Sequence, residues 1–251
     1  MMSNEELLFQ ACESGDKGKV IELLGKGCKV NSRISYGRTP LAYAVQFGHA
    51  DIVDCLIKNG ADVKVKVDGY ERKNEGSFIV PEMPLFELLI QTSIGGKDPN
   101  RIAIATLLVK QGAAVNDDKH AMVVSALMRN ELDMAEFLVN SGADVNQKDE
   151  YDRNPIILAS QMDNALEFNR LIIAKGADVN STTRESYTPL VFASIKLNVD
   201  LVKELLKNGA DRSIATEDNK TALSIAEKNI VSMYQEKDKA AARAIASLLR
   251  A

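Results

Sequence analysis

The 251-residue chain has no tryptophan, and only 5% of its residues are aromatic. Its 31 lysines and arginines are outnumbered by 35 aspartates and glutamates, which gives a formal net charge of −4 at pH 7. Proteins that bind nucleic acid need a clustered basic surface that displaces counterions, and those that hold single strands add aromatic rings for the bases to stack on. The composition therefore argues against nucleic acid as a partner.

Residues that carry chemistry are scarce as well. The chain has two histidines, His49 and His120, and three cysteines, Cys12, Cys28 and Cys55. Their positions do not match the spacing of zinc ligands, and two isolated histidines offer little for a nucleophile–base pair. His49 lies in a Gly-His turn, and we expect His120 to be solvated in a short loop. We predict no enzyme activity, no metal and no cofactor, and we interpret the cysteines as small buried hydrophobes in a reducing compartment.

Long apolar runs are also missing. No window of the chain approaches the roughly 18 continuous apolar residues of a membrane-spanning helix. The first residues, MMSNEELLFQ, lack the basic and then apolar order of a signal peptide. Apolar residues make up 45% of the chain and charged residues 26%, which favours a packed body over disorder. We therefore expect a cytoplasmic protein without membrane association.

What the chain does have is a repeated tetrapeptide. Gly-Ala-Asp-Val begins at Gly60, Gly142 and Gly176, and near copies begin at Gly27, Gly112 and Gly209. The steps between successive glycines are 33, 52, 30, 34 and 33 residues. A period in this range is typical of a stacked repeat array.

A second block, Thr-Pro-Leu-x-x-Ala, follows the glycine by twelve residues in the regular repeats, at Thr39–Ala44 and Thr188–Ala193. With these two blocks the chain resembles the ankyrin-repeat proteins, whose unit is a β-turn plus two helices of about 33 residues with a T-P-L-H-x-A signature. The resemblance implies an all-α solenoid of helix-turn-helix units joined by β-turn or hairpin loops. The histidine of the signature is missing from every repeat, so adjacent loops must be tied together in another way.

Local chemistry supports the same helices. A threonine can cap the first helix of a repeat, and proline fits the first turn, where its missing N–H costs nothing. A column of small residues lets helix pairs approach closely, and the glycines end the second helices in a left-handed conformation. The predicted first helices begin near Glu5, Thr39, Met83, Ala121, Asn154, Thr188 and Thr221. The small column consists of Ala11, Ala44, Ala126, Ala159, Ala193 and Ala226, with Leu88 in the third repeat.

We predict one domain of seven repeats over the whole chain, monomeric when free. A closing helix over Lys237–Arg250 would cap the last repeat, since terminal repeats need a polar outer face. The predicted repeats are residues 4–31, 32–64, 65–115, 116–145, 146–179, 180–212 and 213–251.

The repeat breaks in the middle of the chain. The 52-residue step adds two insertions to repeat 3, one in the loop over Lys64–Pro84 and one in the turn over Gln91–Asn100. The stretch from Val115 to Ala121 in repeat 4 is three residues shorter than its counterpart in repeat 2. A long loop beside a short one predicts a notch near repeats 3 and 4, and we expect the partner-binding site to be centred there. The insertions are either tolerated drift, because extra loop costs little stability, or a projecting recognition loop.

In the resembled family, the two positions after the small column point toward the concave side. The five inner repeats each carry one apolar residue there: Phe47, Ile90, Met128, Met162 and Ile195. Such a row either packs between repeats or forms an apolar stripe for a partner. Tyrosine and arginine, the residue types that lead lists of interface hot spots, gather in the loops. The predicted contact residues are Tyr36, Arg38, Phe47, Tyr70, Arg72, Phe78, Met128, Arg129, Tyr151, Met162, Arg184 and Tyr187.

The resemblance implies a protein-protein interaction module, which would bind through loop tips and the concave face of the first helices. An alternative is a stoichiometric inhibitor or immunity-type protein that blocks a partner enzyme. A third is an effector directed at a host, which would need secretion. The sequence does not name the partner, because repeats of this kind bind many targets.

Overall fold

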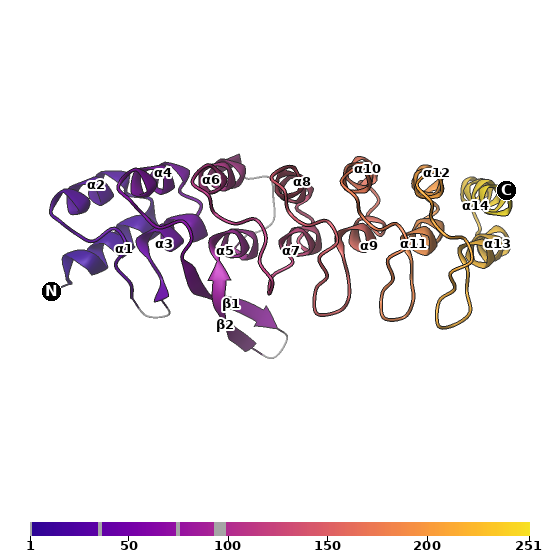
Figure 1. The fold of residues 1–251 in the computed structure, drawn as a ribbon, viewed down its shortest axis with the longest axis horizontal. Coiled ribbons are helices and arrows are strands. Elements are labelled where there is room, and N and C mark those ends of the chain that lie inside the picture. The colour runs from indigo at the N-terminus through magenta and orange to yellow at the C-terminus, as the bar shows by residue number, and fades with distance from the viewer. Residues whose placement is uncertain (1, 35–36, 74–75, 93–98) are drawn as a thin grey trace. The chain divides into compact units, whose positions relative to one another are not determined.

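In a computed structural model, the described residues are 2–34, 37–73, 76–92 and 99–251, and their side chains are described outside residues 69–81 and 93–99. The chain divides into two compact parts, Met1–Ser125 and Ala126–Ala251, called here the N-terminal half and the C-terminal half. The expected single domain stays a prediction, and each half is described by itself. In each half, helices form two rows of antiparallel pairs (Figure 1).

In the N-terminal half, the first helices α1, α3 and α5 contact one another in series, as do the second helices α2, α4 and α6. A further helix, α7 (Met122–Met128), begins in this half and ends in the next. The bounds are α1 (Asn4–Ser14), α2 (Lys17–Gly25), α3 (Pro40–Gln46), α4 (Ala50–Lys58), α5 (Leu85–Gln91) and α6 (Pro99–Lys110).

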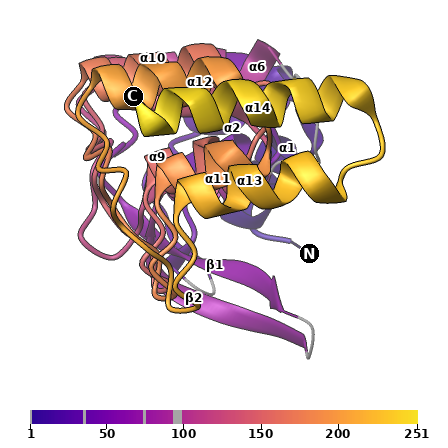
Figure 2. The ribbon, with the colours of Figure 1, turned by 90° about the vertical axis from the view of Figure 1, so that its right-hand side faces the viewer.

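In the C-terminal half, the first helices α9, α11 and α13 are in contact in that order, and the second helices α8, α10, α12 and α14 make a parallel series. Figure 2 shows α13 and α14 as the outermost pair of this half. The bounds are α8 (Leu132–Asn140), α9 (Pro155–Ala159), α10 (Leu166–Ala174), α11 (Pro189–Ile195), α12 (Val199–Lys207), α13 (Ala222–Ser232) and α14 (Glu236–Arg250). The predicted closing helix is therefore confirmed as α14.

The predicted capping signals act as expected. The hydroxyls of Thr39, Thr188 and Thr221 and the amide oxygen of Asn154 accept hydrogen bonds from the backbone N–H three residues on, at 3.1–3.2 Å. Proline opens α3, α9 and α11. The glycines that follow six of the second helices have φ between 81° and 93°, in the left-handed region that other residues avoid. All seven first helices begin within two residues of the predicted positions.

The core is the seam between neighbouring helix pairs. Every alanine of the small column is buried, and so is Leu88 in its place in α5. The apolar faces of the second helices fill the other side, as Ile52, Val53 and Leu56 do in α4. No helix pair could bury this surface alone, so stacking is what stabilises each repeat.

Asparagines tie adjacent loops together where the signature histidine is missing. The side-chain amide of Asn146 donates to Gly176 O at 2.9 Å, and its oxygen accepts from the N–H of Asp178 at 2.9 Å. Asn31 makes the same two bonds to Gly60 and Asp62, and Asn180 makes them to Gly209 and Asp211. Each asparagine directly follows its own Gly-Ala-Asp-Val block or near copy. The motif thus marks both a helix end and a link between repeats.

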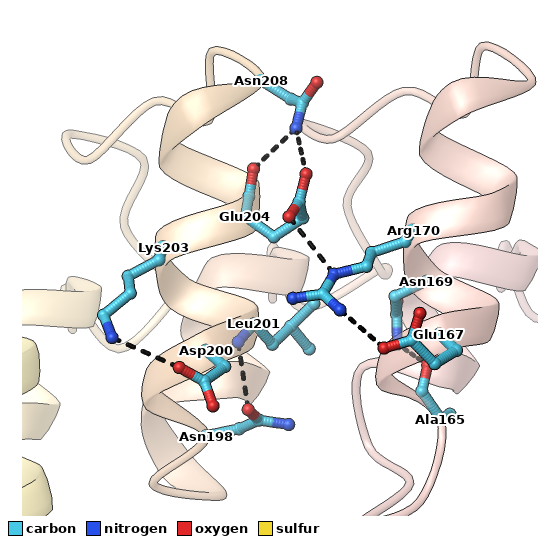
Figure 3. Close-up of polar contacts among 10 residues, drawn as sticks. All are labelled: Ala165, Glu167, Asn169, Arg170, Asn198, Asp200, Leu201, Lys203, Glu204 and Asn208. Carbon is cyan, nitrogen blue, oxygen red and sulfur yellow. Dashed lines mark hydrogen bonds and ion pairs between the residues drawn. The ribbon is translucent and has the colours of Figure 1, made fainter.

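The second helices of the C-terminal half are also joined on their outer face. The guanidinium of Arg170 in α10 lies between Glu167 of its own helix, at 2.5 Å, and Glu204 of α12, at 3.4 Å (Figure 3). Asn208 in turn donates to the side chain and the carbonyl of Glu204. These exposed ion pairs help to align the repeats, although each adds little stability.

The first insertion of repeat 3 forms an antiparallel hairpin of β1 (Lys66–Lys73) and β2 (Gly76–Pro84). Its pairing runs from Lys66 with Pro84 to Lys73 with Gly76, with a register shift between Val67 and Gly69. Val67 and Met83 are buried where the hairpin joins the helices. The hairpin extends away from the helices of its own half (Figures 1 and 2). The sequence predicted a long loop here, and the finding is that the insertion has regular structure of its own.

Candidate functional site

The loop between α8 and α9 ends in a tight turn that presents Tyr151. Asp149 begins this turn, and its carboxylate accepts hydrogen bonds from the backbone N–H groups of Tyr151 and Arg153, both at 2.9 Å. The same carboxylate holds the guanidinium of Arg153 at 2.6 and 2.8 Å. Aspartate stabilises turns in this way by bonding to the backbone that follows it. Because the turn is braced from within, Tyr151 stays 51% exposed.

Two arginines flank the Tyr151 ring. The guanidinium carbon of Arg153 lies 4.8 Å from the ring centroid, and that of Arg184, from the next loop, lies 5.9 Å from it. Arg184 is held there by Asp152, at 3.0 Å, and by the carbonyl of Glu150. Cation–π contacts of this kind fix the orientation of exposed rings. Two neighbouring loop tips are therefore joined around one tyrosine.

Met128, at the end of α7, contacts the same group. Its sulfur lies 3.1 Å from a guanidinium nitrogen of Arg153, and the residue is 56% exposed. Met128, Tyr151, Arg153 and Arg184 are called here the Tyr151 cluster. Three of the four are among the predicted contact residues. Arg153 is not among them, although its position two residues after Tyr151 in the same loop is a signal that the sequence offers.

The end of α11 adds a second exposed apolar residue. Ile195 is 41% exposed, and the ammonium of Lys196 pairs with Asp163 of the preceding repeat at 3.0 Å. Leu197 has a φ of 55°, which is rare for a leucine. Among the other predicted residues of this half, Arg129 is exposed and Met162 is half-buried. Tyr187 is half-buried and stacks on Phe192 at 5.3 Å.

The predicted residues of the N-terminal half are placed differently. Arg38 is only 6% exposed, because it lies over the Tyr43 ring and donates to Gln46 and to the carbonyl of Asp68. It braces a loop and offers a partner little surface. Phe47 is exposed and stacks on Tyr43 at 6.2 Å. The residues of the expected apolar row thus differ in exposure, since Ile90 is buried and Phe47 is not.

The remaining predicted residues fall where little is described. Tyr36 lies outside the described residues. Tyr70 and Arg72 lie on β1 opposite Ile79 and Ser77, and Phe78 lies on β2 opposite Glu71. Only the backbone is described at these strand positions. The predicted notch near repeats 3 and 4 crosses from one half to the other and stays a prediction.

An ionic group fastens the base of the hairpin. The Asp117 carboxylate accepts from Lys66 of β1 at 2.6 Å and from the His120 ring at 2.7 Å, and Lys119 pairs with Glu82 of β2 at 2.8 Å. Burial raises the pKa of Asp117, but the hydrogen bonds from Lys66 and His120 outweigh that effect and lower it to about 2. The expectation of a solvated His120 was wrong, because its side chain is 11% exposed. Lys66 and Asp117 are 51 residues apart in sequence, so no local sequence pattern predicts their ion pair.

The described part of the chain holds no group of three His, Cys, Asp or Glu side chains that could bind a metal ion. Its helices include none with the length and apolar character that a bilayer crossing requires. Cys12 and Cys28 are buried, as expected, whereas Cys55 is only partly covered.

Comparisons with known proteins give matches of one kind. Residues 2–67 and 96–183 match a family model described as ankyrin repeats (3 copies), and residues 171–226 match one described as ankyrin repeats (many copies). Neither match includes residues 68–95, which hold most of the hairpin and α5.

Curated relatives share part of the chain. The 2-5A-dependent ribonuclease of Mus musculus is 40% identical over 63 residues, which are 25% of this chain and 9% of that protein. The ankyrin repeat, SAM and basic leucine zipper domain-containing protein 1 of Ornithorhynchus anatinus is 36% identical over 64 residues, 26% of this chain and 14% of that protein. The chain therefore matches less than a fifth of the length of either relative.

The ankyrin repeat domain of Bcl-3, a unique member of the IkappaB protein family, resembles the whole chain in structure. The two share 21% identity with a TM-score of 0.67, over 98% of each chain. At this identity the likeness shows the fold alone.

Proposed function

Since the chain belongs to the ankyrin-repeat family, whose domains are in general protein-protein interaction modules, we propose that it binds a partner protein through its loop tips and the exposed ends of its first helices. In the C-terminal half, the Tyr151 cluster is the main contact with the partner. Ile195, which belongs to the repeat after that of Tyr151, adds to it. The observation that carries the proposal is an exposed tyrosine held between two arginines. Tyrosine and arginine are the residue types that dominate interface energies.

The arrangement suits recognition because it is formed before any partner arrives. Asp149, Asp152 and Met128 already hold the two arginines in place. A side chain whose conformation is fixed loses less entropy on binding, so more of the contact energy appears as affinity. The exposed Met128 adds a flexible apolar surface, which is common where proteins meet.

The test is capture of partner proteins from a native lysate with three forms of the chain. Tyr151→Ala/Arg184→Ala is compared with wild type and with Tyr234→Ala/Arg250→Ala, a control that removes the same two residue types elsewhere on the C-terminal half. Tyr234 is almost fully exposed, and Arg250 pairs only at the surface with Glu227. A partner held by wild type and control should bind the cluster variant at least about thirtyfold more weakly, as expected for hot-spot loss.

Equal affinity of all three forms for every captured protein would contradict the proposal. The same partner then separates scaffolding from inhibition. If the partner is an enzyme, loss of its activity on one-to-one mixing would favour the inhibitor alternative, and unchanged activity would favour a scaffold.

A further inference from the structure

At one junction between repeats, a lysine stands where other junctions have a linking asparagine. Asn31, Asn146 and Asn180 each directly follow one glycine block, and each binds the glycine carbonyl of the next block and the second N–H after that glycine. At the junction of repeats 2 and 3, the residue after Gly-Ala-Asp-Val is Lys64. Lysine has three donors and no acceptor, so it cannot reproduce the two-sided pairing of a carboxamide.

The backbone that would receive an asparagine is nevertheless formed. Gly112 has a φ of 81°, close to the 91° of Gly176. The N–H of Ala113 donates to Leu108 O at 3.0 Å, as that of Ala177 donates to Ile172 O at 2.9 Å. Among the described residues, no side chain of repeat 2 bonds to Gly112 O or to the N–H of Ala114. Within the part of the chain that the structure describes, the acceptor and donor that Asn31, Asn146 and Asn180 fill elsewhere therefore have no such side-chain partner here.

A surface pocket lies at this place. It has a volume of about 300 Å³, in the range of small ligand sites, and its lining includes the buried apolar residues Val65, Leu85 and Phe86. Gly112, Ala113, Ala114 and Lys64 also line it. The Lys64 side chain passes close to the turn, since its Cε lies 4.0 Å from the point where a Cβ on Gly112 would stand. The pocket exists at the junction where the linking side chain is missing.

We propose that this pocket binds the side-chain carboxamide of an asparagine or glutamine from a partner protein. The NH₂ group donates to Gly112 O, the amide oxygen accepts from the N–H of Ala114, and the methylene groups contact Val65 and Leu85. The chain displays this pairing three times with its own asparagines, so the ligand chemistry is specified by the protein itself. A carboxylate cannot donate to Gly112 O, and a leucine side chain can pair with neither group. The site lies in the N-terminal half and does not depend on the Tyr151 cluster.

The first test uses nuclear magnetic resonance of the ¹⁵N-labelled full chain, titrated with N-acetyl-asparagine N-methylamide. The amide resonance of Ala114 should shift downfield in a saturable manner, because its proton gains an acceptor. The matching aspartate and leucine compounds should give smaller, non-saturating shifts at this residue. An equal response to all three compounds, or a stronger one to aspartate, would overturn the assignment. Acetamide, a free carboxamide, tests whether the ligand is a side chain or a small molecule. If it binds as tightly as the asparagine compound, a protein side chain is rejected as the ligand.

The second test supplies the missing asparagine from the chain itself, by substitution of Lys64. Lys64→Asn should close the link, so that exchange of the Ala114 amide proton with solvent slows about tenfold, toward the rate of the Asp178 and Asp211 amides. The same variant should no longer respond to the asparagine compound. Lys64→Ala is the control, and it should keep both fast exchange and the response. If Lys64→Asn and Lys64→Ala behave alike in both measurements, the open pairing site does not exist.

Discussion

Leu197 occupies a backbone conformation that leucine rarely adopts. Its φ is 55°, and the corresponding turn positions of other repeats are held by Gly15, Gly48 and Asn130, all with positive φ. Asparagine tolerates this region because its short polar side chain bonds locally. We expect Leu197→Asn to raise the free energy of unfolding by about 0.5–1 kcal/mol, as measured by urea denaturation. Leu197→Ala keeps the unfavourable φ and should not raise the free energy of unfolding. If it raises that free energy as much as Leu197→Asn does, the leucine side chain and not the backbone conformation is the cause.

Residues in rarely populated conformations tend to persist at functional sites. Leu197 directly follows Ile195 and Lys196, at the exposed end of α11. If the conformation serves binding, Leu197→Asn should weaken the affinity for the captured partner while it stabilises the fold. A variant that is more stable and binds as well as wild type would show that the conformation is only tolerated.

Asp117 makes the base of the hairpin sensitive to acid. A carboxyl whose pKa falls from 3.8 to about 2 on folding stabilises the fold fully above pH 3.8, and that contribution is lost as the pH drops toward 2. Asp117→Asn should cost about 1–3 kcal/mol at pH 7, because it removes the charge from bonds to Lys66 and His120. Denaturation at pH 7 and at pH 3 should show a smaller difference for this variant than for wild type. A parallel decline in both proteins would place the acid sensitivity elsewhere.

At the scale of elements, the asparagine links are expected to stabilise the junctions between repeats. Asn146→Ala removes the two hydrogen bonds that join the turn after the Gly142 block to the Gly176 block, and it should lower the free energy of unfolding by about 1–2 kcal/mol. Asn208→Ala is a matched control, because that side chain bonds only to Glu204 of its own helix. It should change stability by no more than about 0.5 kcal/mol. Equal losses in urea denaturation would mean that the links between loops carry no special weight.

The helices and the links between repeats differ in how well the sequence predicts them. Helix starts at Thr39, Thr188 and Thr221 were predictable because caps and glycine stops are local signals. The link made by Asn146 was not predicted, since its partners lie 30 and 32 residues away and only the neighbouring repeat brings them close. The insertion was predicted as a loop although β-branched and aromatic residues occur in it. The hairpin forms only because its two strands pair with each other, and the residue pattern of one strand is a weak predictor of that pairing.

At the scale of the whole molecule, the hairpin is the largest departure from a regular repeat, and most of it lies in residues 68–95, which the family models do not match. Tyr151, Met128 and Arg184 could be anticipated as contact types, but their meeting around one ring depends on the stacking of loops from different repeats. Arg38 shows the converse, since a loop arginine chosen by type is buried in a structural role. Residue type thus indicates candidates, and only the stacked fold decides which of them face solvent.

The hairpin itself is expected to serve recognition rather than stability. We predict that replacing residues 69–81 with a short turn abolishes binding of a partner that uses Tyr70, Arg72 or Phe78, and lowers the free energy of unfolding by less than about 1 kcal/mol. Loop length costs little, and the variant keeps the Lys66–Asp117 ion pair and the buried Val67 and Met83. Isothermal titration with the captured partner gives the affinity, and urea denaturation gives the free energy of unfolding.

The Tyr151→Ala/Arg184→Ala variant is the comparison, because it leaves the hairpin whole. Unchanged affinity in the shortened variant would identify the insertion as tolerated drift, whereas a large loss of stability would mean that the hairpin belongs to the core of its half.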